Sequence, residues 1–206
     1  MTQVLCVTRT VLNIKHPKDT KAIYDLDFTK IKYNHLHFID RSVVDSNEPK
    51  LLAIAQQLPQ VLPYVVVKYK DNFLTYSRAK GAESRLHGKL SLGFGGHIDL
   101  DDLEDFEYIV LDGVMRELME ELNLDVTSAY FLTNMSKALV DTTNDVGSVH
   151  LGLLYVLEID ELDSIDADEN EISLAEWQTL EQIQANKHQY ENWSQLVIDD
   201  ILPTLK

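Results

Sequence analysis

The segment from Gly93 to Leu122, GFGGHIDLDDLEDFEYIVLDGVMRELMEEL, constrains the fold more than any other part of the chain. On a helical wheel of about 100° per residue, apolar residues fill one arc of its second half and carboxylates fill another. The apolar arc contains Leu111, Val114, Met115, Leu118 and Leu122. The acidic arc contains Glu117, Glu120 and Glu121. This spacing predicts a helix that packs one side on a sheet and carries the carboxylates on the other.

The acidic arc of this helix indicates a metal site. Three carboxylates within about one helical turn repel one another unless a cation lies among them. Mg²⁺ is the natural counter-charge, because it binds carboxylate oxygens and usually bridges to substrate phosphates. Arg116, one turn before Glu120, is placed to fix a carboxylate by a bidentate hydrogen bond. An acidic doublet on a helix is more often a solvated face, so the interpretation needs support from the preceding residues.

That support comes from the glycines upstream of the helix. Gly93, Gly95 and Gly96 leave little side-chain bulk between the backbone and a ligand. A carbonyl there could reach the metal, and N–H groups could approach a phosphate. His97 follows directly and is either a substrate contact or a histidine held by local hydrogen bonds.

Basic residues gather just before the glycines, although the formal net charge of the chain is −16. That charge disfavours binding to duplex nucleic acid and to anionic membranes. Taken alone, such residues are more often a solvated hairpin edge, and their position beside the acidic stretch makes four of them candidate phosphate contacts. The four are Arg78, Lys80, Arg85 and Lys89.

The rest of the chain predicts strands on both sides of one helix, followed by terminal helices. Strands are expected at 4–12, 35–44, 64–70, 72–78, 89–94, 129–139 and 146–159. Further helices are expected at 46–58 with Asn47 or Ser46 as its cap, from a capping box at 173–176 to Ala185, and around 193–201. These elements predict an α+β fold, an α/β/α sandwich with a mixed sheet between helices. We expect residues 1–50 to be an extension packed on a main domain of residues 51–206.

The compartment can be inferred from composition. No apolar run approaches the roughly 20 residues that a membrane span requires. The N-terminus is too polar for a secretory signal, and Cys6 is the single cysteine. We therefore expect a cytoplasmic protein.

With these elements placed, the acidic helix and its glycines resemble the Nudix box, G-x5-E-x7-R-E-U-x-E-E-x-G-U with U aliphatic. The matching residues are Gly96, Arg116, Glu117, Leu118, Glu120, Glu121 and Leu124. The similarity covers roughly residues 61–185 and leaves the first 50 or so outside. It implies the Nudix fold, with Glu117 and Glu121 as principal ligands of Mg²⁺, or alternatively Mn²⁺. Glu120 would lie in or beside this ligand set, and the carbonyl of Gly95 or Gly96 would complete it.

The chain departs from the Nudix box at three places. Asp102 stands where the box has its first Glu, and thirteen residues rather than seven separate it from Arg116, an insertion of six. Glu107 is nearer the expected spacing, so the partner of Arg116 stays open between Asp102 and Glu107. Asn123 replaces the final glycine, and Asn tolerates the left-handed turn that ends a helix. Gly113 lies inside the expected helix, where glycine costs about 1 kcal/mol.

The resemblance implies a hydrolase of phosphoric anhydride bonds. Its expected substrate is a small molecule, a nucleoside diphosphate linked to another moiety, cleaved at the diphosphate with bound metal positioning the attacking water. Glu117, Glu120 and Arg116 are the expected catalytic residues. The general base is either a box glutamate or a residue of the late acidic segment, for which the candidates are Glu169, Glu171 and Glu176.

Two alternatives share the fold. An isopentenyl diphosphate isomerase-like enzyme would need a catalytic cysteine, and Cys6 lies outside the matched region. A non-catalytic sensor of nucleotides or nucleotide sugars commonly loses box glutamates, and here all three in the helix are retained. Hydrolysis is therefore the leading hypothesis, since fold alone does not fix function. We leave open whether residues 1–50 recognise substrate or support a homodimer.

Overall fold

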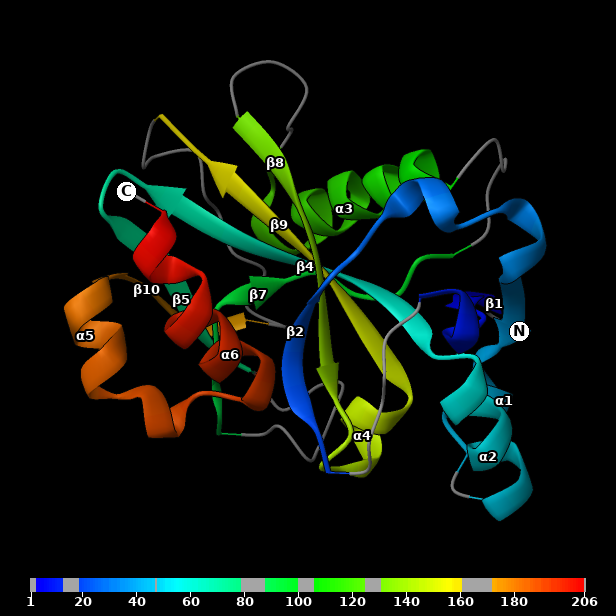
Figure 1. Cartoon of the computed structure of the whole chain (residues 1–206). Coiled ribbons are helices and arrows are strands. Elements are labelled where there is room, and N and C mark those ends of the chain that lie inside the picture. Colours follow the sequence, from blue (N-terminus) through cyan, green and yellow to red (C-terminus); the bar gives the residue numbers. More distant parts are fainter. Residues whose placement is uncertain are drawn as a thin grey trace. The chain divides into compact units, whose positions relative to one another are not determined.

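The computed structural model describes residues 3–12, 19–46, 48–78, 88–99, 106–124, 131–160 and 172–205 (Figure 1). The strands are β1 (Gln3–Val7), β2 (Lys21–Asp25), β3 (Leu36–Asp40), β4 (Gln60–Tyr69), β5 (Asn72–Arg78), β6 (Leu90–Ser91), β7 (Gly93–Phe94), β8 (Phe131–Asp141), β9 (His150–Glu158) and β10 (Ile172–Thr179). The α-helices are α1 (Arg41–Val44), α2 (Pro49–Gln57), α3 (Phe106–Leu122), α4 (Asp145–Ser148), α5 (Leu180–Ala185) and α6 (Asn192–Asp200). Short 3-10 helices span Arg9–Leu12, Phe28–Lys30, Tyr33–His35, Lys187–Gln189 and Leu202–Thr204. The predicted α+β class is confirmed.

The chain divides into two compact units. Unit 1 contains Met1–Pro63, Gly96–Gly113 and Ser136–Leu154, and unit 2 contains Tyr64–Gly95, Val114–Met135 and Tyr155–Lys206. The sheet has the strand order β10-β5-β4-β9-β8-β2, and β4, β8 and β9 each supply residues to both units. The predicted boundary near residue 50 stays a prediction. Within the described ranges, no helix is long and apolar enough to cross a membrane.

Unit 1 is built around β1. This strand pairs antiparallel with β3, from Gln3 opposite Asp40 to Val7 opposite Leu36, and meets β4 where Cys6 lies opposite Gln60. On its other edge the Leu5 N–H donates to the Ile98 carbonyl at 2.8 Å. Helices α1 and α2 lie beside these strands (Figure 1), and together they bury a small apolar core. Its fully buried members are Val4, Cys6, Val44, Ala55 and Val149.

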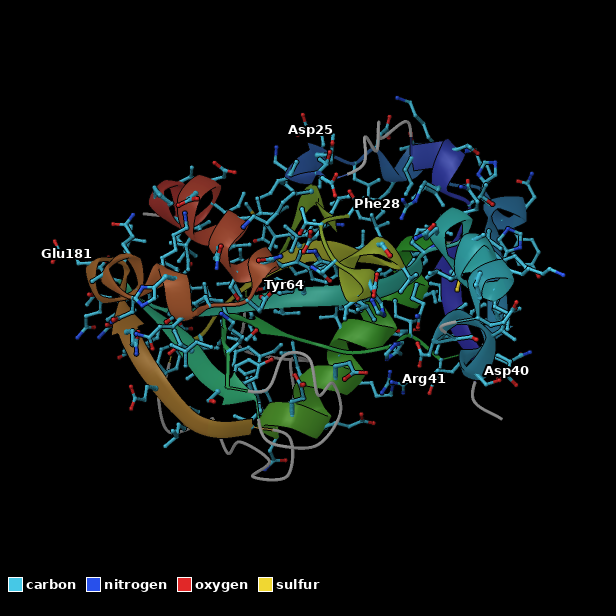
Figure 2. The ribbon with its side chains drawn as sticks, turned by 90° about the horizontal axis from the view of Figure 1, so that it is seen from below. Asp25, Phe28, Asp40, Arg41, Tyr64 and Glu181 are labelled. Carbon is cyan, nitrogen blue, oxygen red and sulfur yellow. The ribbon has the colours of Figure 1, made fainter. Side chains whose placement is uncertain are left out.

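Unit 2 contains the predicted hairpin, because β4 pairs with β5 next to a turn in which Lys70 adopts a φ of 52°. A second feature is the close packing of Tyr64 on Gly93: a Cβ on Gly93 would lie 2.1 Å from the Tyr64 ring. The hydroxyl of Tyr64, which is labelled in Figure 2, donates to Glu191 Oε1 at 2.8 Å and contacts Ser194 Oγ at 2.7 Å, at the start of α6. Burial, followed by the charge of Glu191, raises the pKa of Tyr64 well above its usual value. The hydroxyl therefore stays a neutral donor that anchors α6.

Two predicted elements are wrong in type over part of their length. The strand expected over 35–44 ends at Asp40, whose carboxylate accepts from the Ser42 N–H at 2.9 Å and starts α1 instead. The first part of the helix expected from Ser173 to Ala185 is the strand β10, which pairs with β5 from Ile172 opposite Arg78 onward, and only its last part is helical, as α5. The capping box that operates lies later in the chain, where Thr179 and Gln182 exchange hydrogen bonds and open α5. Pairing with a neighbouring strand therefore overrides local capping preference.

Other boundaries are also corrected. The first strand ends at Val7 and gives way to a 3-10 helix, and β2 has no counterpart among the predicted strands. Glu48 caps α2 through its carboxylate, whereas Ser46 Oγ accepts from the Glu48 N–H and Asn47 lies outside the described residues. The strand at 89–94 is interrupted between β6 and β7.

Gly113 within α3 and Asn123 at the end of this helix each have a structural role. Asn123 adopts a φ of 52°, which confirms its expected left-handed conformation at the helix end. Gly113 is needed for close approach, because a Cβ there would lie 2.8 Å from Ile98 Cγ1. Glycine at this point lets α3 pack directly on the segment that contains Ile98.

Candidate functional site

The acidic residues of α3 occupy two different environments. Glu117 and Glu121 are buried, with 8% and 6% of their surface exposed. Glu120 is exposed, with 58% of its side-chain surface accessible. The predicted helix is therefore present, and its apolar side is buried at Val114, Leu118 and Leu122. Two of its three carboxylates are withdrawn from bulk water, where a charged group requires compensation.

The glycine segment lies against one of the buried carboxylates. The Gly95 N–H donates to Glu121 Oε2 at 2.8 Å. Gly95 has a φ of 135°, which a residue with a side chain rarely adopts. Glycine backbone therefore lies next to a carboxylate of α3 at Gly95, as the sequence predicts. The carbonyl of Gly96 remains a predicted metal ligand.

Arg116 divides its guanidinium between two neighbouring glutamates. Its Nη2 lies 2.9 Å from Glu117 Oε1, and its Nη1 lies 2.9 Å from Glu120 Oε2. This differs from the expected bidentate bond to one carboxylate, because each guanidinium nitrogen takes a separate partner. Asp102 and the side chain of Glu107 lie outside the described residues, so their relation to Arg116 stays open.

The other predicted site residues are only partly visible. Lys89 is exposed, His97 is half-buried, and Glu176 is exposed on β10, where it accepts from Gln178 Nε2 at 3.3 Å. The remainder lie outside the described residues. These are the side chain of Arg78, and Lys80, Arg85, Glu169 and Glu171. All of them remain predictions.

A second group of polar side chains, which we call the histidine cluster, lies in unit 1. Asp45, His97 and His150 each place a potential ligand atom within 4.8 Å of the other two. The two imidazole rings have centroids 5.9 Å apart and planes inclined by 66°. The sequence indicates His97 as a candidate substrate contact, whereas no pattern in it distinguishes Asp45 or His150. No sequence spacing connects the three, because they come from separate segments that the fold brings together.

Cys6 is the residue on which the isomerase alternative depends. It is fully buried on β1. Burial, followed by the charge of Asp45, raises the pKa of its thiol to about 12. The thiol therefore stays protonated near neutral pH, and a protonated thiol is a poor nucleophile or proton-transfer group. This environment argues against a catalytic cysteine.

Comparison with known proteins identifies the family. The model of the NUDIX domain matches residues 64–200. Protein YmaB of Bacillus subtilis (strain 168) is 35% identical over 144 residues, covering 68% of this chain and 69% of YmaB. This chain therefore belongs to the Nudix family, and the predictions of a Nudix fold and of an enzyme of the Nudix hydrolase class are confirmed.

Solved structures agree on the fold. The crystal structure of Tm1382, assigned to the Nudix hydrolases, has a TM-score of 0.71 at 22% identity and covers 98% of this chain and 99% of its own. The bifunctional NMN adenylyltransferase/ADP ribose pyrophosphatase of Francisella tularensis, complexed with AMP and Mn, has a TM-score of 0.51 at 16% identity. That match covers 77% of this chain and 48% of the bifunctional protein. The individual site residues, the inserted six and the Asp102 departure remain predictions.

Proposed function

We propose that this protein hydrolyses the diphosphate of a nucleoside diphosphate linked to another moiety, with Mg²⁺ as its cofactor and Mn²⁺ as the alternative. The observation that supports this most is the 2.8 Å hydrogen bond from the Gly95 N–H to Glu121 Oε2. It brings side-chain-free backbone against a buried carboxylate of the box helix. A diphosphate and its metal need this combination of oxygen ligands and clearance.

The donor set on α3 fits a hard divalent cation. Glu117 and Glu121 offer carboxylate oxygens, the ligands that Mg²⁺ prefers over nitrogen or sulfur. Both are buried, so a bound cation would offset the desolvation of their charges. When bound, the metal would neutralise the diphosphate and lower the pKa of the attacking water.

We assign separate roles to the neighbouring side chains. Arg116 holds Glu117 and Glu120 in fixed positions through its two 2.9 Å contacts. Glu120, as the exposed member, is accessible to solvent and would complete the metal site or accept the proton of the attacking water. Gly96 would add a carbonyl ligand. Substrate phosphates would be bound by the basic residues predicted from the sequence, Arg78, Lys80, Arg85 and Lys89, and His97 stays a predicted substrate contact.

One structural relative and the net charge of the chain both guide the choice of substrates to test. The Francisella tularensis protein carries the name of an ADP ribose pyrophosphatase, and its similarity supports testing ADP-ribose first. The net charge of −16 supports a small-molecule substrate over nucleic acid or an anionic membrane. A cytoplasmic location completes the proposal, and the role of residues 1–50, in substrate recognition or in a homodimer, stays open.

The test is a hydrolysis screen with Mg²⁺ over ADP-ribose, nucleotide sugars, dinucleoside polyphosphates, NADH and nucleoside triphosphates. The control is Glu121→Gln, which preserves side-chain shape and removes the charge. We expect turnover of a diphosphate-linked nucleoside by the parent and its loss in the variant. Equal activity of the two proteins, or no turnover of any compound, would sink the proposal. Tight metal-dependent binding without turnover would instead identify a sensor.

A further inference from the structure

A set of nitrogen and oxygen ligands separate in sequence from the box glutamates lies in unit 1. We propose that Asp45, His97 and His150 form a binding site for a divalent transition-metal ion, with Zn²⁺ as the best chemical match. Two imidazoles and one carboxylate are a ligand set that Zn²⁺ uses with a further position open to water or substrate. Mg²⁺ prefers oxygen ligands, so the cluster and the α3 carboxylates would select different metals.

Coordination of one ion by the histidine cluster requires the side chains to move toward one another. The three ligand atoms lie within 4.8 Å of one another. Two ligands of a tetrahedral zinc ion at about 2.1 Å each lie about 3.4 Å apart, so the widest pair would close by up to roughly 1.4 Å. Asp45 can supply this movement, because 43% of its side-chain surface is exposed. His150 is only 8% exposed and provides the fixed side of the site.

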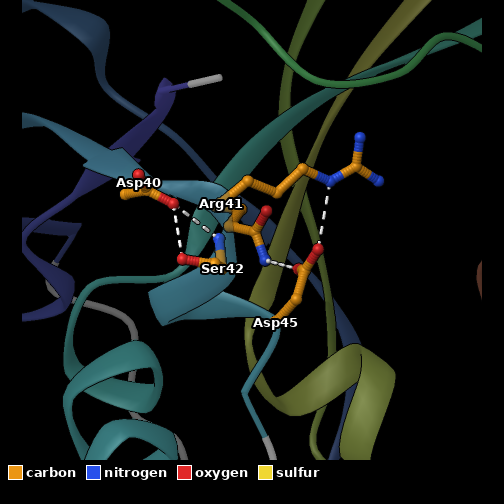
Figure 3. A network of polar contacts seen from close by, with 5 residues as sticks. Asp40, Arg41, Ser42 and Asp45 are labelled. Atoms are coloured by element: carbon orange, nitrogen blue, oxygen red, sulfur yellow. Dashed lines mark hydrogen bonds and ion pairs between the residues drawn. The ribbon is translucent and has the colours of Figure 1, made fainter. Parts of the chain in front are cut away.

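The Asp45 carboxylate is already oriented by two donors. Arg41 Nε donates to Asp45 Oδ2 at 3.0 Å, and Gln60 Nε2 donates to Asp45 Oδ1 at 3.0 Å (Figure 3). The start of α1 is fixed as well, since Ser42 donates to Asp40 Oδ1 through both its N–H and its hydroxyl (Figure 3). Ligating carboxylates in metal sites are typically held by hydrogen bonds of this kind.

His150 is oriented in the same manner. Its Nδ1 lies 2.6 Å from the Val146 carbonyl oxygen. Because a carbonyl only accepts, Nδ1 must carry the hydrogen, and Nε2 is then the nitrogen with the lone pair that a metal takes. A backbone carbonyl on the second nitrogen is a usual partner of a metal-ligating histidine. The tautomer required for coordination is therefore set by α4.

An independent observation comes from Gln60, which is completely buried. Its Nε2 is bound to Asp45, whereas its Oε1 has no hydrogen-bond partner among the residues described. A buried amide oxygen without a partner is costly in a folded protein. A water held by a metal at the cluster would be a donor for it, because metal-bound water is strongly polarised. Gln60 thus points to a ligand beside the three metal-binding residues.

The experiment uses the full chain after chelation and dialysis. Co²⁺ is titrated in the presence of excess Mg²⁺, which occupies carboxylate sites and does not compete for imidazole. We expect about one Co²⁺ per chain with visible ligand-field absorption, bleached when Zn²⁺ is added. His97→Gln and His150→Gln should abolish this absorption, and Asp45→Asn should weaken binding. Glu117→Gln combined with Glu121→Gln should leave it unchanged.

A second variant guards against loss of folding. Gln60→Leu keeps all three ligands and removes the donor to Asp45 together with the acceptor proposed for metal-bound water, so Co²⁺ affinity should fall by about 10-fold to 100-fold. Circular dichroism is compared for every variant. Unchanged absorption in both histidine variants, or no absorption at saturating Co²⁺, would overturn the site. Loss of absorption in the double glutamate variant would assign the ion to α3 and equally overturn it. None of these outcomes depends on hydrolysis, so the proposed function is tested separately.

Discussion

The α3 carboxylates and the histidine cluster are two ligand sets built in opposite ways. Glu117, Glu120 and Glu121 lie close together on a single helix, and their relation follows from a repeat of 3.6 residues. Asp45, His97 and His150 come from three segments far apart in the sequence, and only the fold relates them. One set offers oxygen and the other mainly nitrogen. Sequence patterns therefore reveal local ligand sets, whereas ligand sets assembled by tertiary structure must be found in three dimensions.

The largest expected effect is a loss of hydrolysis when one of the α3 carboxylates is removed. Glu121→Gln should lower kcat/KM by at least about 100-fold, because a lost metal ligand removes several kcal/mol of transition-state stabilisation. Steady-state kinetics with increasing Mg²⁺ provide the measurement, and Asp112→Asn, an exposed residue of the same helix, is the matched control. If Asp112→Asn were as inactive as Glu121→Gln, the effect would report helix damage rather than loss of a ligand.

Regions fixed by neighbouring residues can be predicted from the sequence, whereas regions fixed by distant residues cannot. The β4–β5 hairpin, α3 and the left-handed Asn123 are predictable because each depends on neighbours within a few residues. The strand β10 has the local pattern of a helix, and its pairing partner β5 lies far earlier in the chain. The sequence predicts that glycine backbone lies near the α3 carboxylates, but it does not predict that the Gly95 N–H donates to Glu121. Asp45 and His150 carry no local signal, so the histidine cluster could not be predicted.

A smaller effect is expected from a backbone change at Gly95, which should impair the α3 carboxylate site and leave the histidine cluster intact. Gly95→Ala should lower kcat/KM by roughly 10-fold, because a side chain at a φ of 135° adds about 1–3 kcal/mol of backbone strain. Co²⁺ binding at the histidine cluster should stay within about twofold of the parent, since none of its ligands is altered. Paired kinetics and Co²⁺ titrations of one preparation make the test. Loss of both activities together would show that Gly95 matters for folding as a whole.

A further test concerns the packing beside His97. In Gly113→Ala the new Cβ would lie 2.8 Å from Ile98 Cγ1, which is too close without a shift. Overpacking costs about 1–3 kcal/mol and exceeds the gain of about 1 kcal/mol in helix propensity, so the free energy of unfolding should fall by about 1 kcal/mol. Urea denaturation measures the change. Asp112→Ala, at the exposed neighbouring position, is the control and should not destabilise. A stabilised Gly113→Ala would show that Ile98 yields easily.

The smallest expected effect is a change in the pH dependence of the unfolding free energy, caused by the buried thiol of Cys6 in unit 1. Its folded pKa of about 12 lies above the ordinary value of 9.0, so the unfolded thiol ionises first as pH rises. The stabilising contribution is complete below about pH 9 and is lost progressively toward pH 12, by about 1 kcal/mol between pH 9 and pH 10. Cys6→Ala should therefore lose less unfolding free energy than the parent over that interval, as measured by urea denaturation at each pH. Identical slopes for the two proteins would mean that the thiol ionises as readily in the folded chain as in the unfolded one.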